Sequence, residues 1–452
     1  MFRPFRPDRP AFLAEILDTL TERGRALLGG RTDVPLMAAP DLAQLAEVLL
    51  SRRGEAAGVA LADSLGRAYA AAARDQRLAF LILLAEKFGP DPARATEAMN
   101  AVTHGQAGAL DALHAASEPR RQELFRRINQ APGGTQILLQ MRVDLLDALP
   151  EMPLLRPVND DFVHLFASWF NRGFLSLRQI DWATPANILE KIIRYEAVHE
   201  IRNWDDLRNR LQPPDRRCYA FFHPQLPDEP LIFVEVALTT GTPAAIAPLL
   251  DLARQPIGAH EAATAVFYSI SNTQRGLAGV SFGNFLIKQV VEVLRAELPQ
   301  VQVFVTLSPV PGFARWLETM RRDETGQSLP APLREALTGL DVPGWEKDPD
   351  RATAIGAALV PAAAFYFLSA RDRRGRVLDP VARFHLGNGA RLERLNPLGD
   401  LSPNGLRQSH GLMVNYRYAL EDIERNHEAF AERGEVVASD PVRRALPAQM
   451  TS

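Results

Sequence analysis

Ser308 is the first of three polar side chains through which this sequence could carry chemistry. It lies in TLSPVPGF at the end of a predicted strand, followed by Pro309 and Pro311. These prolines would stiffen the strand exit and fix the direction of the hydroxyl group. Ligands of open α/β sheets gather at such strand ends. A serine that merely opens a turn is the alternative interpretation.

His385 and Tyr418 are the other two candidates. His385 stands before the GNG segment at 387–389, which predicts a hairpin-type turn, in ARFHLGNGARLERLNPLGD. A histidine that titrates near neutral pH can donate a proton to carbon or oxygen. Tyr416 and Tyr418 alternate in a strand-like run. The alternative is structural: a lone histidine before a turn, and tyrosines half-buried with their hydroxyls satisfied.

A glycine-rich loop, SISNTQRGLAGVSFGNFLIK, joins a predicted strand to a predicted helix. Gly276, Gly279 and Gly283 permit tight turns and close backbone approach. The N-terminus of the helix offers free amide groups, which suit a phosphate. The spacing matches neither a P-loop nor GxGxxG. It is closer to the pyrophosphate loop of the acetyltransferase-like (GNAT) fold, and a purely structural glycine turn is the alternative.

The elements before residue 150 are predicted to be helices. Residues 41–53, DLAQLAEVLLSRR, place their leucines at helical spacing after a capping aspartate. Three prolines between 150 and 157 interrupt the helical pattern. The sequence therefore predicts an all-α domain over residues 1–155.

Beyond about residue 215 the pattern changes to short apolar segments that are typical of strands. These are PLIFVEVALT, AATAVFYSIS and VQVFVTLS, with the amphipathic segment FGNFLIKQVVEVLRAEL between the last two. The order strand, loop, helix, strand predicts an α/β domain over residues 156–452. The fold class expected for the whole chain is α+β and multidomain.

Composition excludes several function classes. The 452 residues carry 51 basic and 54 acidic side chains, a net charge of −3, which argues against a nucleic-acid binder. Cys218 is the one cysteine, so a disulfide framework and CxxC-type metal sites are excluded. No HExxH motif occurs, and we expect no metal.

Membrane insertion and export are not expected either. No run of 18 uncharged apolar residues occurs, and the arginine-rich N-terminus lacks the apolar centre of a signal peptide. We expect a cytoplasmic protein that does not bind membranes.

Four segments taken together resemble one family. They are EAVHEIRNWDDLRNRL, FYSISNTQRGLAGVSFGNFLIK, FVTLSPVPGF and FHLGNGARLERLNPLGDLSPNGLRQSHGLMVNYRY. In this order they closely resemble the malonyl-CoA decarboxylase family, from about residue 155 to 430.

The resemblance implies an architecture and an activity. It implies an N-terminal helical domain used in oligomerisation, with a homotetramer expected, and a catalytic domain of the GNAT-like fold. The implied reaction converts malonyl-CoA to acetyl-CoA and CO₂ without metal, biotin or another prosthetic group. No cofactor is therefore expected, since coenzyme A is part of the substrate.

The resemblance also implies roles for residues. The family's catalytic serine, in SPxPGF, corresponds to Ser308, and its catalytic histidine, in FHLxNGA, to His385. The tyrosine that supports the histidine corresponds to Tyr418. The coenzyme A-binding stretch corresponds to Ala278, Gly279, Val280, Ser281, Phe282, Gly283 and Asn284. Ser281 stands where some relatives carry a carboxylate, so a catalytic duty of that side chain does not carry over.

Two other functions fit parts of the pattern. One is an acyltransferase that uses the same loop for an acyl-CoA and needs an acceptor. The other is a helical scaffold whose second domain only senses coenzyme A esters, for which Ser308 and His385 would both be unnecessary. Release of CO₂ from malonyl-CoA alone would distinguish the decarboxylase from both.

Overall fold

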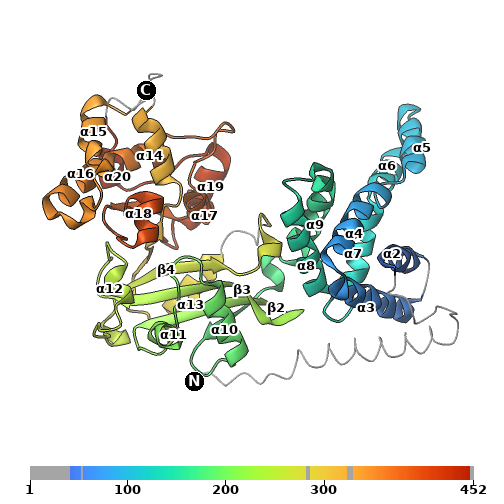
Figure 1. Ribbon diagram of the computed structural model, residues 1–452, viewed down its shortest axis with the longest axis horizontal. Helices are drawn as coiled ribbons and strands as arrows, with labels where there is room; N and C mark the ends of the chain where they lie inside the picture. The colour runs from blue at the N-terminus through green and yellow to red at the C-terminus, as the bar shows by residue number, and fades with distance from the viewer. Residues whose placement is uncertain (1–40, 52–53, 281–285, 323–328, 448–452) are drawn as a thin grey trace. The chain divides into compact units, whose positions relative to one another are not determined.

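The computed structural model of the chain describes residues 41–51, 54–280, 286–322 and 329–447. It divides into two compact units (Figure 1). The first unit comprises Met1–Ser176, Phe222–Glu229 and Gln274–Phe282. The second unit comprises Leu177–Phe221, Pro230–Thr273 and Gly283–Ser452. The first unit thus runs past the predicted domain boundary at 155/156, which stays a prediction.

The first unit is helical over its N-terminal described part, as the sequence predicts. Its helices are α2 (Leu42–Leu50), α3 (Glu55–Ala71), α4 (Arg74–Lys87), α5 (Pro92–Thr103), α6 (Ala109–Ser117), α7 (Arg120–Asn129), α8 (Gly134–Ala148), α9 (Arg156–Trp169) and the short 3₁₀ turns η1 (Pro153–Leu155) and η2 (Arg172–Phe174). The Asp41 side chain caps α2 by accepting a hydrogen bond from the Ala43 amide at 2.9 Å. Stacked rings of Phe125 and Phe162, 4.1 Å apart, join α7 to α9.

An eight-stranded sheet forms the frame of the second unit. The strands are β1 (Ser176–Ile180), β2 (Arg216–His223), β3 (Leu226–Thr239), β4 (Thr264–Asn272), β5 (Val303–Thr306), β6 (Ser308–Pro309), β7 (Arg391–Asn396) and β8 (Met413–Arg417). Their spatial order is β1-β2-β3-β4-β5-β8-β6, and β7 pairs with β8. The three strand segments predicted from the sequence are β3, β4 and β5.

The pairing directions of the sheet are mixed. β4 and β5 run parallel, with Phe267 opposite Thr306, whereas β3–β4, β5–β8, β6–β8 and β7–β8 are antiparallel. A parallel pair needs a crossover connection, and α13 (Leu286–Glu297) supplies it. The predicted combination of an N-terminal helical region with a mixed α/β region is confirmed.

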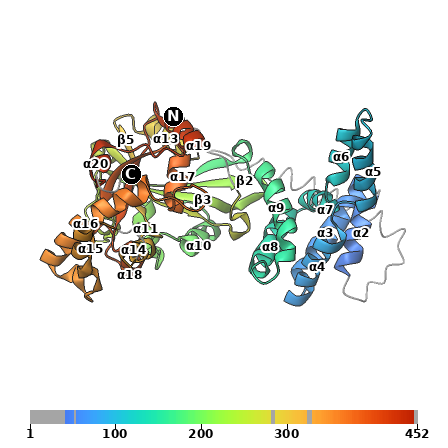
Figure 2. The same ribbon diagram turned by 90° about the horizontal axis from the view of Figure 1, so that it is seen from above.

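The second unit contains further helices besides α13. They are α10 (Ala186–Tyr195), α11 (Trp204–Leu211), α12 (Ala247–Leu250), α14 (Phe313–Arg322), α15 (Ala331–Ala336), α16 (Pro349–Leu368), α17 (Pro380–Gly387), α18 (Pro403–Ser409), α19 (Ile423–Arg433) and α20 (Asp440–Arg444), with the 3₁₀ turns η3 (Ala259–Glu261), η5 (Leu337–Asp341) and η6 (Trp345–Lys347). Helices α14, α15 and α16 pack together in both views (Figures 1 and 2).

Helix α16 is long and apolar enough to cross a membrane by length and composition alone. More than half of its apolar stretch is buried inside the protein, with Leu359, Ala363 and Phe367 fully covered. Such burial is what a core helix of a globular protein shows.

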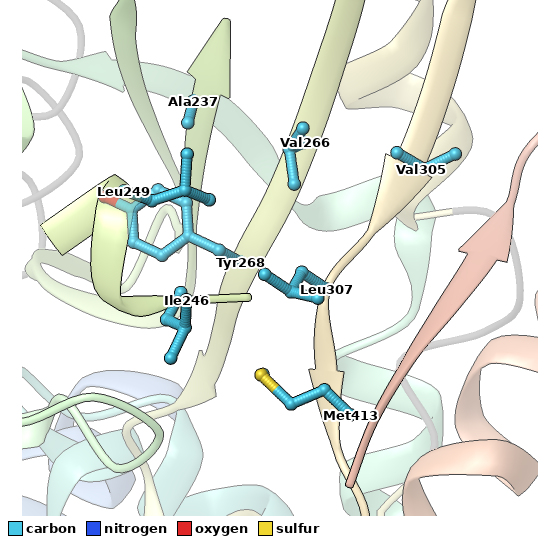
Figure 3. Close-up of a cluster of buried hydrophobic side chains, with 8 residues drawn as sticks. All are labelled: Ala237, Ile246, Leu249, Val266, Tyr268, Val305, Leu307 and Met413. Atoms are coloured by element: carbon cyan, nitrogen blue, oxygen red, sulfur yellow. The ribbon is translucent and has the colours of Figure 1, made fainter. Parts of the chain in front are cut away.

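One face of the sheet buries a hydrophobic cluster that matters for the site. Figure 3 shows its eight side chains, Ala237, Ile246, Leu249, Val266, Tyr268, Val305, Leu307 and Met413. Val305 and Leu307 point into it from the segment that forms β5 and leads into β6. Because side chains alternate along an extended chain, Thr306 and Ser308 lie on the opposite face.

Candidate active site

Ser308 is held on the sheet by strand pairing. It begins β6 and lies opposite Val414 of β8 in an antiparallel pair. Only 5% of the residue is exposed. The predicted strand end is therefore real, and Ser308 continues the ladder beyond β5 instead of opening a free turn.

His385 lies on the short helix α17, and the predicted hairpin turn at 387–389 is wrong. Asp379 caps this helix by accepting a hydrogen bond from the Ala382 amide at 2.8 Å, and Pro380 occupies its first turn. The GNG segment instead ends the helix. Gly389 has φ of +80°, and a Cβ there would stand 2.2 Å from the Ile423 carbonyl oxygen, so glycine is required.

Tyr418 follows directly after β8. Its amide donates to the Phe304 carbonyl at 2.8 Å, which extends the pairing of β8 with β5 by one step. Its ring is buried, with Phe267 of β4 at a centroid distance of 6.3 Å. The backbone thus fixes the position of the phenol.

The structure brings Ser308, His385 and Tyr418 into one hydrogen-bonded chain. Ser308 Oγ lies 3.1 Å from His385 Nε2, and His385 Nδ1 lies 2.8 Å from the Tyr418 hydroxyl. All three side chains are buried, although the residues are far apart in the sequence. Their catalytic roles stay a prediction, but the spatial grouping that such roles need is present.

Burial determines the protonation states of the hydrogen-bonded side chains. Burial lowers the pKa of His385 from 6.5 to about 3, because the imidazolium loses its hydration. Burial likewise raises the pKa of Tyr418 well above 10. Tyr416 stacks on the imidazole at 4.6 Å between ring centroids and completes its apolar wall. At neutral pH the group therefore consists of a neutral imidazole and neutral hydroxyls.

Thr306, which the sequence analysis did not single out, adds one more hydroxyl to this hydrogen-bonded group. Ser308 Oγ donates to Thr306 Oγ1 at 2.8 Å, and the Tyr416 amide donates to the same oxygen at 3.1 Å. The signal for Thr306 was its spacing, since a residue two before Ser308 on an extended chain shares its face. The stacking of Tyr416 on His385 had no comparable signal.

The glycine loop is only partly covered by the described residues. Ala278, Gly279 and Val280 are described, and Ser281, Phe282, Gly283 and Asn284 lie outside the described residues. Gly279 has φ of +75°, a conformation that side chains disfavour.

The preceding turn η4 (Arg275–Leu277) packs against α8 within the first unit. Arg142 of α8 donates to the carbonyl oxygens of Gly276 and Ala278, both at 2.7 Å. A Cβ at Gly276 would lie 2.6 Å from the Leu139 carbonyl oxygen, so glycine permits this approach. Burial lowers the pKa of Arg142, whose guanidinium group donates to the loop backbone. Nothing in the sequence pointed to this residue.

The described residues hold no group of three or more His, Cys, Asp or Glu side chains placed to bind a metal ion. The arrangement offers two functions from the chain itself. A buried neutral imidazole can move a proton, and a serine hydroxyl beside it can bond an anionic oxygen.

Comparison with known proteins places this geometry in a family. Residues 173–452 match the model of the malonyl-CoA decarboxylase C-terminal domain, and residues 88–170 match that of the N-terminal domain. The mitochondrial malonyl-CoA decarboxylase of Rattus norvegicus is 38% identical over 410 residues, which cover 83% of each chain.

Solved structures agree with these matches. The crystal structure of malonyl-CoA decarboxylase from Rhodopseudomonas palustris is 64% identical, covers 90% of this chain and 100% of its own, and has a TM-score of 0.86. That from Agrobacterium vitis is 56% identical, with the same coverage and a TM-score of 0.85.

These matches define the class of protein as an enzyme, a carboxy-lyase. Within that class the chain belongs to the malonyl-CoA decarboxylase family.

The buried imidazole predicts a dependence of stability on pH. The pKa of His385 is about 3 in the folded protein and near 6.5 when unfolded. Below pH 6.5 only the unfolded state takes up this proton, so stability falls as the pH falls. Between pH 7 and pH 5 the free energy of unfolding should lose about 2 kcal/mol through His385. His385→Asn should remove that part of the loss in urea titrations at the two pH values.

The matched control is His104→Asn, since His104 is exposed on the helical unit. It should keep the pH dependence of the wild type. Equal pH dependence in His385→Asn and the wild type would mean that His385 is not the buried neutral group described above.

Proposed function

We propose that the chain converts malonyl-CoA to acetyl-CoA and CO₂ using its own side chains and no prosthetic group. The observation that carries this proposal is the buried chain of Ser308, His385 and Tyr418, with contacts of 3.1 and 2.8 Å. Membership of the malonyl-CoA decarboxylase family supports the choice of substrate.

Decarboxylation requires the site to stabilise an enolate and then to protonate its α-carbon. Breaking the bond between the carboxylate carbon and the α-carbon releases CO₂ and leaves the electron pair in an enolate of the thioester. The thioester carbonyl is the electron sink, so no pyridoxal or thiamine is needed. The enolate charge needs hydrogen-bond donors, and the α-carbon then needs one proton.

Ser308 is assigned to the carboxylate that leaves. Its hydroxyl is buried on the site face of the sheet and can turn its hydrogen toward an anionic oxygen. Such a bond orients the carboxylate for departure. Its contribution is orientation of the reacting group, because the carboxylate loses its charge as CO₂ departs.

His385 is assigned to protonation of the enolate carbon. Its low pKa, about 3, makes the neutral imidazole the working form, with the Nε2 hydrogen as the proton that is transferred. The α-carbon of a thioester is a far weaker acid than an imidazole N–H, so this transfer is downhill. The Tyr418 hydroxyl, at 2.8 Å from Nδ1, stabilises the negative charge left on the ring until solvent returns the proton.

The loop at 278–284 is assigned to the pyrophosphate of coenzyme A. Backbone amide groups at a helix N-terminus bind phosphate well, and we assign the thioester oxygen to a backbone N–H of this loop as well. The bonds from Arg142 to Gly276 and Ala278 support this assignment, because they hold the start of the loop in one conformation.

The direct test incubates the purified chain with malonyl-CoA and follows CO₂. The wild type should release CO₂ and form acetyl-CoA with no acceptor present, whereas an acyltransferase would need one. In the same assay His385→Asn should lower kcat at least about 100-fold, the range of a general acid, and keep acetyl-CoA binding. Near-normal turnover in this variant would remove the histidine from the mechanism.

Ser308 and the loop should separate kinetically, because acetyl-CoA lacks the carboxylate but keeps the pyrophosphate. Ser308→Ala should raise the barrier by about 2–4 kcal/mol in kcat and leave acetyl-CoA affinity nearly unchanged. Gly279→Val should weaken substrate and product together, because valine disfavours φ of +75° and crowds the phosphate. Calorimetric titration with acetyl-CoA decides the matter, and equal loss of affinity in both variants would make Ser308 a coenzyme A contact.

The proposed assembly is a homotetramer formed through the helical unit. Met99 and Leu110, on the packed helices α5 and α6, are 55% and 72% exposed and offer apolar surface to a second copy. Light scattering at micromolar concentration should show the tetramer, and Leu110→Glu should lower the mass. A monomeric wild type would contradict the proposal.

The proposed location is the cytoplasm, because the one cysteine of the sequence, Cys218, fits a reducing compartment. Activity found in another fraction of the source cell would contradict it.

A further inference from the structure

We propose that Thr306 is a positioning residue of the reaction. It accepts the hydrogen of Ser308 and thereby holds His385 in the tautomer whose Nε2 nitrogen carries the proton. The inference rests on the proposed role of His385 as proton donor, and its test below can fail separately from that role.

Thr306 is a fixed acceptor. Its residue is fully buried, and its Oγ1 accepts the Ser308 hydroxyl at 2.8 Å and the Tyr416 amide at 3.1 Å. Its carbonyl oxygen accepts from Asn415 Nδ2 at 2.7 Å, which pins the backbone at this point. The Tyr416 amide takes one lone pair of Oγ1 and the Ser308 hydroxyl takes the other, so the hydrogen of Thr306 itself points away from Ser308.

Tyr418 lies at the other end of the hydrogen-bonded chain, beside His385 Nδ1. A buried phenol hydrogen that finds no acceptor costs free energy comparable to a lost hydrogen bond. Within the described part of the chain, His385 Nδ1 at 2.8 Å is the acceptor that the structure shows for it. With Nδ1 as this acceptor, the single hydrogen of the neutral ring resides on Nε2.

The two ends impose the same direction on the bonds between them. Ser308 gives its hydrogen to Thr306, so its lone pair is free to accept from Nε2–H at 3.1 Å. Tyr418, His385, Ser308 and Thr306 then donate and accept in one consistent order. The Nε2 hydrogen, which is the one needed at the substrate carbon, is in place before malonyl-CoA arrives.

Removal of the Thr306 hydroxyl makes Ser308 and Tyr418 compete for the one acceptor nitrogen of the neutral ring. Without it, the acceptor that the structure leaves for the Ser308 hydrogen is His385 Nε2. A ring that accepts at Nε2 carries its hydrogen on Nδ1, facing Tyr418. The imidazole then has no proton to give on the side of the serine.

The test compares Thr306→Val, Thr306→Ser and the wild type by ¹⁵N NMR of labelled histidine and by kinetics. The His385 signals are assigned by their absence in His385→Asn. Thr306→Val should populate the tautomer with the hydrogen on Nδ1 and lower kcat by up to about tenfold, the cost of one neutral hydrogen bond, without weakening acetyl-CoA binding. Thr306→Ser keeps the hydroxyl and should restore both the tautomer and kcat.

The matched control is Thr264→Val, which places the same substitution at another buried position of the sheet, on β4. It should leave the tautomer and kcat unchanged. If Thr306→Val does not fold, Thr306→Cys replaces it, because a thiol is a much weaker acceptor.

An Nε2 hydrogen that persists in Thr306→Val at wild-type kcat would overturn the inference. So would a loss of activity that Thr306→Ser does not restore, or that appears equally in acetyl-CoA affinity. If the tautomer reverses while His385→Asn remains fully active, Thr306 still sets the tautomer and the proposed role of the histidine is what fails.

Discussion

The contact between Ser308 and His385 is the interaction on which the proposed chemistry depends. It joins β6 to α17 across 3.1 Å in a buried space. A buried imidazole cannot rely on water, so each of its nitrogens must find a partner in the protein. Tyr418 satisfies Nδ1 and Ser308 satisfies Nε2, and burial keeps the ring neutral. Burial therefore keeps the histidine neutral, as its proposed role of proton donor requires.

The two faces of one short stretch of chain maintain this contact. Val305 and Leu307 enter the hydrophobic cluster on one side, while Thr306 and Ser308 face the histidine on the other. A slip of one residue in the β5–β8 or β6–β8 register would bury the hydroxyls in the apolar cluster and expose the leucine to the site. The free energy gained by burying Val305 and Leu307 thus fixes the position of Thr306 and Ser308 on the opposite face. On the other side of the contact, the Asp379 cap begins the helix α17 that carries His385.

The helical unit supports the start of the glycine loop. The Arg142 guanidinium of α8 donates to the backbone carbonyl oxygens of Gly276 and Ala278, where the loop proposed to bind pyrophosphate begins. Because two carbonyl oxygens and one buried cation satisfy each other, this arrangement resists change at either partner. The loop that the sequence presented as part of the second domain is, at its start, a part of the first compact unit.

The sequence by itself determined the N-terminal helices, the strands β3, β4 and β5, and the candidates Ser308, His385 and Tyr418, because periodicity and motif spacing are local properties of the chain. It predicted a hairpin turn after His385 where the structure has a helix end, since a GNG segment serves either and the choice depends on Asp379 and Ile423. Only the tertiary structure decided that Thr306 accepts from Ser308, that Tyr416 covers the imidazole and that Arg142 holds the loop. These facts rest on contacts between segments far apart in the sequence, and burial, hydrogen-bond direction and pKa are properties of that three-dimensional environment.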